Sequence, residues 1–516
     1  MMKRILFLLL FAAAGLPATA QPTRTYEVPK LTDEVRAIRA AAASWTPSKP
    51  LEGTLPASVD NSKLKYFPKV FEQKGGSCAQ SSGIRYLFTY EMNRLLDRDA
   101  QASDANTFSY FYTWNFLNDG IDQGGFAEQG LNIARQQGAM SLADFPDPSS
   151  YFSFKWASGY DKYTRAMQNR VKEIISFEVI SQEGIDLARR YLYDAGDGSA
   201  HGGILSYSAL ATGWTFDSNY SGPSETGYTY MLTKLATDGA HAMTIVGYDD
   251  TVEFSKDGQI HKGAFIVVNS YGTWWGDDGR YYLPYYFFLQ DRPSQTLSHD
   301  VTGCSCTVHS PQVVFRVKVT YDSRNDLAFT MGVADKPYAT TPTVTLKSAI
   351  AANQGGDHPM QGEYSDDNSI ELAFDFTEAV PKYASYTEPK YFLTVTRSEI
   401  GKAGSGVINA FSVIDYRDAD GPKEYVCDLP QPVVLEKGAN LFAAATTALK
   451  TTSASAIQWL DNLWAPYTAP YVLRTASGKY AKFEITDYDR GAGRVTIKYL
   501  YQGDGSRNLN LSLIQI

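Results

Sequence analysis

The sequence contains little cysteine, with four residues in 516: Cys78, Cys304, Cys306 and Cys427. So few cysteines exclude a disulfide-rich scaffold, in which many bridges replace a hydrophobic core. If Cys78 stays a free thiol, at most one disulfide can form among the other three. The single-residue spacing of Cys304 and Cys306 could suggest metal ligands, but a zinc site needs about four ligands with other spacings. We therefore expect no metal.

An excess of positive charge is also absent. The chain has 47 Lys and Arg against 56 Asp and Glu, for a net charge of -9, and no basic stripe that could neutralise phosphates. A nucleic acid is therefore not an expected partner. Hydrophobic residues at 44% and charged residues at 20% exclude a largely disordered or fibrous chain. The length indicates two to four globular domains.

After the first 20 residues the sequence has no apolar run long enough to span a bilayer, so we expect no membrane span. Residues 1–20 combine a basic start, an apolar run of about a dozen residues and a small-residue ending, a pattern typical of a bacterial signal peptide cleaved before Gln21. A membrane anchor is the alternative, although the run is shorter than the ~20 residues of a spanning helix. The mature protein is expected to be secreted or periplasmic.

Helical, strand-like and linker patterns divide the rest of the chain into successive regions. Residues 21–54 contain a short helical stretch and a proline-containing linker, and we interpret them as a short propeptide or N-terminal extension. Residues 55–298 mix helical and strand-like patterns. A helix is expected to open at Cys78, with a core-facing set at helical spacing that comprises Ile84, Leu87, Phe88, Leu95 and Leu96.

Beyond residue 300 apolar residues recur at every second position, a spacing typical of half-buried strands. Three alternating sets show it: Phe315, Val317, Val319 and Tyr321; Ile370, Leu372, Phe374 and Phe376; Tyr391, Leu393 and Val395. These sets predict a β-sandwich domain at residues 299–420. Residues 421–516 are expected to be a second β-rich domain or a continuation of the first.

Three residues in separate motifs could form a nucleophilic site. Cys78 follows a Gly-Gly-Ser turn at the start of the expected helix, where the positive end of the helix favours a thiolate. His241 precedes a strand-like run and could take the thiol proton. Asn269 ends the apolar run of residues 265–268 and could orient the imidazole.

At these points the sequence resembles the papain-like cysteine peptidases, in the chain order Cys, His, Asn. The centre of the nucleophile motif is matched by Gly-Ser-Cys at residues 76–78, and the histidine motif by His-Ala-Met at 241–243 with Val-Gly-Tyr at 246–248. The asparagine motif is matched by Asn-Ser-Tyr-Gly-Thr-Trp-Trp-Gly at 269–276. The resemblance covers about 240 residues, and insertions at 213–230 and 249–262 explain why the motifs are further apart than the ~130 to 150 residues typical of the family.

The resemblance implies an α+β fold: a papain-like two-lobed peptidase domain followed by β-sandwich-like C-terminal domains. It also implies roles for further residues. Gln73 matches the oxyanion-stabilising glutamine with a shift of one position, which leaves Glu72 as the alternative, although a carboxylate would repel an oxyanion. Gly124 and Gly125 match a glycine pair that lines the substrate cleft. Tyr271 stands where the family has a tryptophan that shields the His-Asn pair.

The function expected from these residues is that of a secreted cysteine peptidase, most simply an endopeptidase, which hydrolyses proteins or peptides without a cofactor. The alternative is an exported protein that binds haem, protein or glycan and has a catalytically silent papain-like domain. Residues 471–501 resemble the final strands of HmuY-like secreted haem-binding proteins, so haem or a surface partner is a second candidate ligand for the C-terminal domains. His358, Met331 and Met360 are side chains there that could ligate iron, without a recognisable ligand pattern.

Overall fold

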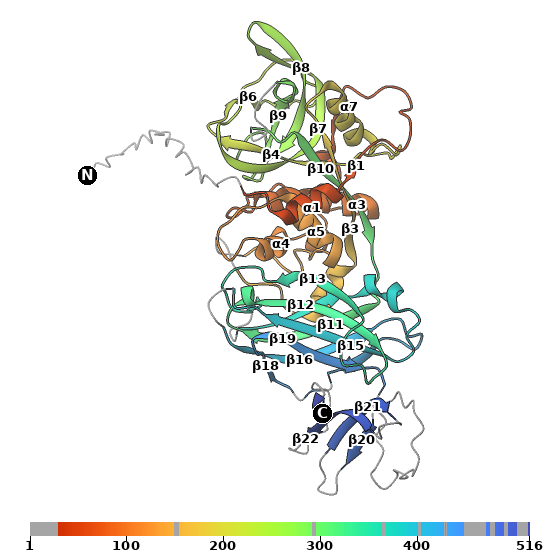
Figure 1. Cartoon of the computed structure of the whole chain (residues 1–516). Helices are drawn as coiled ribbons and strands as arrows, with labels where there is room; N and C mark the ends of the chain where they lie inside the picture. The colour runs from red at the N-terminus through yellow and green to blue at the C-terminus, as the bar shows by residue number, and fades with distance from the viewer. Residues whose placement is uncertain are drawn as a thin grey trace, which may run out of the picture.

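The computed structural model describes residues 29–148, 154–290, 296–363, 368–400, 404–427, 429 and 431–447, and the backbone of four strands between 471 and 515. The predicted signal peptide lies outside these residues. Figure 1 shows four layers from one end to the other: a β lobe, a helical layer, a sandwich of two sheets and a small terminal sheet. The fold is therefore a mixed α+β fold, as the sequence predicts.

The helical layer holds most of the helices. They are α1 (Asp33–Ala41), α2 (Cys78–Gln80), η2 (Ser81–Phe88), α3 (Thr89–Leu96), α4 (Tyr110–Leu117), α5 (Ala127–Gln137) and α6 (Tyr160–Met167), with α7 (Gln182–Asp194) and α8 (Tyr286–Leu289) further along the chain. Short 3-10 turns are η1 (Asn61–Lys63), η3 (Asp104–Asn106), η4 (Arg324–Asp326) and η5 (Thr377–Tyr383).

The helix that opens at Cys78 has an irregular middle. α2, η2 and α3 follow one another without a break, and η2 is a π-helix, in which Thr89 N–H donates to the Ile84 carbonyl five residues earlier. Ile84, Leu87 and Phe88 are fully buried as predicted. Leu95 is 50% exposed, so its predicted core position is wrong. The wider π turn rotates the following residues away from the face that a uniform 3.6-residue period predicts.

A sheet of ten strands runs through the β lobe and into the helical layer, in the order β1-β3-β10-β4-β7-β8-β9-β6-β5, with β2 paired to β7. The strands are β1 (Ala43–Ser44), β2 (Ser58–Asp60), β3 (Asn169–Glu178), β4 (Leu205–Thr212), β5 (Thr215–Asp217), β6 (Met231–Lys234), β7 (Asp238–Lys256), β8 (Gln259–Val268), β9 (Arg280–Pro284) and β10 (Asp300–Val308). The central strand β7 carries His241, and Asn269 directly follows β8. β7 and β8 pair antiparallel as a hairpin that contains the insertion at residues 249–262.

The N-terminal segment is built into this fold. Helix α1 packs on α5, where Arg39 forms an ion pair with Glu128 at 2.8 Å. Strand β1 pairs in parallel with β3. Trp45 packs against Phe177 and Tyr191, with ring centroids 5.4 and 5.1 Å away. The region interpreted as a propeptide or extension thus contributes a helix, a strand and a core aromatic ring.

The sandwich consists of two antiparallel sheets, ordered β14-β11-β16-β17 with β18 beside β16, and β13-β12-β15-β19. Its strands are β11 (Val313–Tyr321), β12 (Leu327–Asp335), β13 (Val344–Ala352), β14 (Ser369–Asp375), β15 (Pro389–Arg397), β16 (Gly406–Asp415), β17 (Lys423–Val426), β18 (Val433–Val434) and β19 (Gly438–Ala445). The three alternating apolar sets predicted from the sequence lie on β11, on β14 and just after it, and on β15, and all are buried. Phe315 and Phe329 meet aromatic rings of the opposite sheet.

Strand pairing shows how far the first sheet and the sandwich extend. β10 pairs with β3 and β4, so the first sheet continues past residue 298. β17, β18 and β19 belong to the sandwich, so this part of residues 421–516 continues the first β domain, one of the two alternatives expected from the sequence. The terminal sheet is β20 (Tyr471–Arg474), β21 (Tyr480–Asp489), β22 (Arg494–Gln502) and β23 (Ile514–Gln515). The extension of the first sheet past residue 298 arises from long-range pairing, which local patterns do not encode.

The sandwich is joined to the helical layer by backbone and charged contacts. Trp156 forms a parallel bridge with Gly362. Lys162 pairs with Glu363, and buried Arg170 pairs with Asp375. These contacts make the sandwich a support of the helical layer.

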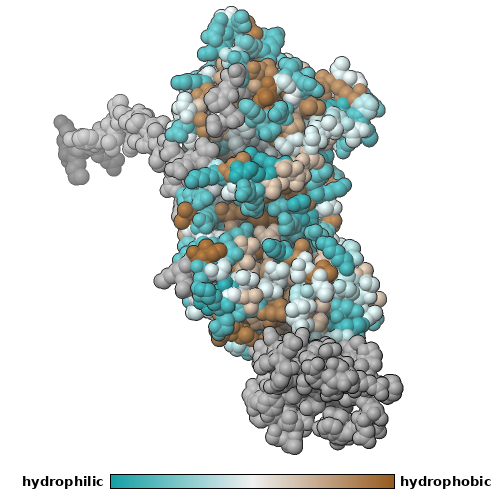
Figure 2. Space-filling model, viewed as in Figure 1, coloured by the Kyte–Doolittle hydropathy of each residue, from teal (hydrophilic) through white to brown (hydrophobic). Residues whose placement is uncertain are grey.

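No helix in the described part of the chain is long and apolar enough to cross a membrane. Figure 2 shows that the hydrophobic residues on the visible face form several small, separate groups among hydrophilic ones.

Candidate active site

Cys78 lies at the first turn of the buried helix, after a tightly packed glycine loop. Gly75 has a φ of +64°, and a Cβ there would lie 2.5 Å from Asp122 Oδ1 and 2.9 Å from Trp114. The backbone N–H of Gly76 donates to the same Asp122 carboxylate. The glycine at 75 is therefore required by both conformation and space, and the loop presents Cys78 at a fixed position.

His241 and Asn269 meet through their side chains. His241 Nε2 lies 2.7 Å from Asn269 Oδ1, and Ser270 N–H donates to the same oxygen at 2.8 Å. An amide oxygen only accepts, so Nε2 carries the proton and Nδ1 is left as the basic nitrogen. The imidazole is thereby held in one tautomer and one orientation.

The Cys78 sulfur lies beside the same strand segment. The backbone N–H of Ala242, the residue after His241, is in hydrogen-bonding contact with the sulfur. Cys78, Ala79 and Ala242 form one small buried cluster. In the described part of the chain, no hydrogen bond joins the sulfur to the His241 ring.

Burial dominates the electrostatics of the pair. Cys78 is 8% exposed and His241 5% exposed. Burial raises the pKa of the Cys78 thiol, against the opposing effect of the Ala242 and Ala79 N–H groups. Burial also lowers the pKa of His241 to about 4, although its bond to Asn269 raises it. Both shifts favour a neutral thiol and a neutral imidazole in the free protein.

Aromatic rings enclose the imidazole on two sides. Tyr271 stacks on it with ring centroids 4.8 Å apart, in the place where the resemblance implies a shield. Trp214 stands nearly perpendicular to it at 6.2 Å. Trp214 in turn packs on Phe216 and Trp275. Sequence analysis did not identify Trp214, because it lies in an insertion outside every motif.

Gln73 is tied to the segment that follows Asn269. Its backbone N–H donates to Ser270 O at 2.8 Å, and its side-chain oxygen accepts from Ser270 Oγ. Its Nε2 donates to Gly75 O at 3.0 Å, which uses one of two amide hydrogens. The alternative residue, Glu72, is exposed and pairs by its backbone with Tyr271.

The glycine pair occupies two different environments. The Cβ position of Gly124 lies 3.7 Å from Gly76 O, so Gly124 borders the loop that carries the cysteine. It also lies 3.6 Å from Pro29, which places the N-terminal segment against this wall. Gly125 faces the Gln129 side chain instead.

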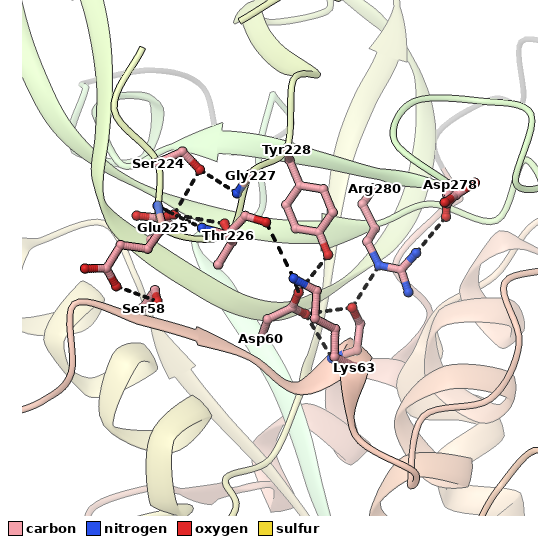
Figure 3. Close-up of polar contacts among 12 residues, drawn as sticks. Ser58, Asp60, Lys63, Ser224, Glu225, Thr226, Gly227, Tyr228, Asp278 and Arg280 are labelled. Atoms are coloured by element: carbon pink, nitrogen blue, oxygen red, sulfur yellow. Dashed lines mark hydrogen bonds and ion pairs between the residues drawn. The ribbon is translucent and has the colours of Figure 1, made fainter. Parts of the chain in front are cut away.

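The insertion at residues 213–230 is held in place by buried carboxylates. Asp249 accepts from the N–H groups of Glu225 and Thr226 at 2.8 and 2.9 Å. The Tyr228 hydroxyl donates to Asp60 at 2.7 Å, and Figure 3 shows this loop facing Ser58, Asp60 and Lys63. These contacts hold the second half of the insertion, while pairing of β5 with β6 holds its start next to Trp214.

The candidate metal and haem ligands have other contacts. The described residues contain no group of three or more His, Cys, Asp or Glu placed to hold a metal ion. Met331 and Met360 are fully buried, and His358 Nε2 donates to Gly120 O at 2.6 Å. Cys78, Cys304 and Cys306 are free thiols. The side chains of the HmuY-like stretch lie outside the described residues, so that resemblance stays a prediction.

No protein-family model matches the chain, and no curated protein matches it. Among solved structures it is similar to xylellain, a cysteine protease from Xylella fastidiosa, with 19% identity over 55% of this chain and 96% of that chain and a TM-score of 0.37. It is also similar to procathepsin L 3 of Tenebrio molitor larval midgut, with 15% identity over 51% of this chain and 74% of that chain and a TM-score of 0.33. A third similar structure is proCathepsin B S9 from Trypanosoma congolense, with 16% identity over 53% of this chain and 88% of that chain and a TM-score of 0.34. Papain-like cysteine proteases are thus among the structural neighbours of this α+β fold. The low TM-scores leave function to be argued from the side chains.

Proposed function

We propose that this protein is a cysteine peptidase in which Cys78 is the nucleophile, His241 the general base and acid, and Asn269 the residue that orients the imidazole. The observation that carries the proposal is the 2.7 Å contact between His241 Nε2 and Asn269 Oδ1, on a strand whose next residue touches the Cys78 sulfur. A structural histidine has no need of a fixed tautomer with its second nitrogen left basic.

The reaction follows from these roles. His241 Nδ1 takes the thiol proton as the sulfur attacks the carbonyl carbon of a peptide bond. The imidazolium then gives that proton to the leaving amine, and an acyl-enzyme thioester remains. Water, deprotonated by His241, attacks the thioester and releases the acid, which regenerates the thiol. No metal or cofactor takes part in these steps.

The pKa shifts select one version of this mechanism. Because burial favours the neutral forms of both Cys78 and His241, the free protein does not store a thiolate and an imidazolium. Proton transfer instead accompanies attack, when the substrate carbonyl becomes the acceptor of negative charge. Hydrogen bonds in such sites commonly tighten only once substrate is bound.

Gln73 is proposed as the side chain that stabilises the oxyanion, together with the backbone N–H of Cys78. Its position is supported by the bonds to Ser270, which fix it beside the Asn269 segment. One Nε2 hydrogen is not used by Gly75 and could donate to the developing charge.

Walls on both sides of Cys78 favour endopeptidase action on extended protein or peptide segments. Gly124 borders the loop of the nucleophile, and Trp214 stands beside the imidazole that protonates the leaving amine. Export to the periplasm or the medium is part of the proposal and depends on the signal-peptide pattern of residues 1–20.

Three observations favour the second candidate, a binding protein with a silent peptidase domain. Cys78 is nearly buried, its thiol pKa is raised, and Pro29 lies against the Gly124 wall. A sulfur in such surroundings could be inert.

Cleavage of an unfolded protein such as reduced casein separates the two candidates. We expect the protein to cleave casein internally, Cys78→Ala to abolish cleavage, and the matched variant Cys306→Ala to leave it unchanged. Equal activity of the protein and its Cys78→Ala variant, or no cleavage by either over a range of pH, would favour the binding protein.

A further inference from the structure

A pocket of about 210 Å³ lies between the helical layer and the sandwich. It is lined by Phe154 and Lys155 before α6, by Arg324 of η4, and by His358, Pro359 and Gln361 of the loop before β14. None of these six residues carries a carboxylate, although the chain as a whole has a net charge of -9. The volume is below the ~300 Å³ at which drug-sized ligand sites begin, so the pocket suits a small molecule.

Arg324 differs from the other buried arginines of the described residues. Arg85, Arg170 and Arg190 each form an ion pair with an aspartate. Arg324 is 1% exposed and forms no ion pair with any described carboxylate. Its guanidinium lies over the Trp156 ring at 4.7 Å, and Nη1 donates to Phe154 O at 2.6 Å.

One edge of this guanidinium has no acceptor among the described residues. Nε is buried without a hydrogen-bond partner, and Nη2 forms no hydrogen bond within the described chain. The hydrogens of Nε and Nη2 lie on the same edge, in the fork that matches two oxygens of a carboxylate or phosphate. Burial lowers the pKa of Arg324 to about 9, so the group is still charged at neutral pH. An unpaired buried cation of this kind is costly.

We propose that this pocket binds a small oxyanion, a carboxylate or a phosphate, through the unpaired edge of Arg324. Lys155 lines the same pocket and adds positive charge. His358 stacks on Phe154 at 4.4 Å, and together with Pro359 these rings form a wall for an apolar group attached to the anion. Because its walls come from both layers, a bound anion strengthens their contact.

The pocket also borders a loop that reaches the nucleophile. His358 Nε2 donates to Gly120 O, and Asp122, two residues later, accepts from the backbone of Gly76. Anion binding therefore supports the segment of residues 118–125 without contact between the anion and Cys78.

Isothermal titration of the whole protein with phosphate and with acetate, each at constant ionic strength set with chloride, tests the proposal. We expect saturable binding of one or both, and the stronger ligand identifies the class. Arg324→Gln should weaken binding by at least about tenfold, the loss expected for one charge-assisted hydrogen bond. Arg316→Gln is the matched control, because this partly buried arginine carries the same charge outside the pocket.

A second measurement needs no variant at Arg324, which could fail to fold. Crystals of the unaltered protein soaked in tungstate should show an anomalous peak within hydrogen-bonding distance of Arg324 Nη2, and Lys155→Met should weaken the titration while the protein stays folded. Absence of saturable binding, equal binding by folded Arg324→Gln, or a tungstate peak only elsewhere would overturn the proposal.

Discussion

Tyr271 stacks on the imidazole of His241, with ring centroids 4.8 Å apart and ring planes inclined by 23°. The stack keeps water away from the hydrogen bond between His241 and Asn269, which is worth more in a dry site than in solvent. Tyr271→Phe keeps the ring and should retain activity. Tyr271→Ala exposes the bond and should lower kcat about tenfold, equivalent to ~1.4 kcal/mol of barrier. Steady-state kinetics on one peptide substrate checks this, and equal kcat values for the two variants would contradict the shielding role.

The pH dependence of activity follows from the pKa of His241. The base must be neutral to take the thiol proton, and burial lowers its pKa to about 4. The value of kcat/KM should therefore rise with pH through about 4 and be level by pH 6. An acid limb with its midpoint near 6.5, the ordinary value for histidine, would contradict the buried neutral pair.

The lowered pKa of His241 also affects the stability of the folded protein. The measurement of activity against pH therefore needs a control for folding. The unfolded chain protonates this histidine near pH 6.5, whereas the folded chain protonates it near 4. Its contribution to stability is therefore complete above about 6.5 and is lost as the pH falls toward 4. Circular dichroism at each pH must show that the protein is folded where its activity is measured.

Gln73→Ala tests the proposed oxyanion donor. Loss of one preorganised donor should lower kcat by about 10²- to 10³-fold with little change in KM. The matched variant Glu72→Gln alters the exposed neighbour and should keep full activity. If Glu72→Gln impaired kcat and Gln73→Ala did not, the one-position shift in the motif would have been assigned to the wrong residue.

Trp214 should determine preference for the residue that follows the scissile bond. Its ring stands beside His241. In the proposed mechanism His241 protonates the leaving amine, so the departing part of the substrate passes close to Trp214. Trp214→Ala should lower kcat/KM about tenfold for substrates with a large apolar residue at that position, and less for those with alanine. Trp274→Ala is the control, since Trp274 is 58% exposed. A uniform loss over all substrates would indicate a structural role only.

Local sequence patterns were sufficient to predict strands β11, β14 and β15 of the sandwich. The alternation along β11, β14 and β15 reflects one buried and one outer face, a property of each strand by itself. The membership of β10 in the first sheet was not predictable in this way, because the residues of β3 and β4 that pair with it lie about 95 to 140 residues earlier in the chain. The exposure of Leu95 depends on a π turn, for which the sequence has no clear signal.

The sequence was sufficient to predict the three motif residues of the candidate site, Cys78, His241 and Asn269. It was not sufficient to predict the residues that surround them. The order of the cysteine, histidine and asparagine motifs identified three side chains that the structure brings to one place. Trp214, which lies beside His241, belongs to an insertion. His358, which donates to Gly120 O, belongs to another domain, in the loop before β14. Their positions depend on tertiary contacts, so no local motif predicts them.

Alkylation of the intact protein by a thiol-directed epoxide, read by peptide mass spectrometry, tests the central claim most directly. Cys306 provides an internal control, because it is more exposed than Cys78. If His241 activates the sulfur, Cys78 should be labelled first, and His241→Ala should slow that labelling while leaving Cys306 unaffected. Labelling that follows exposure, with Cys306 modified and Cys78 untouched under reducing conditions, would contradict the account.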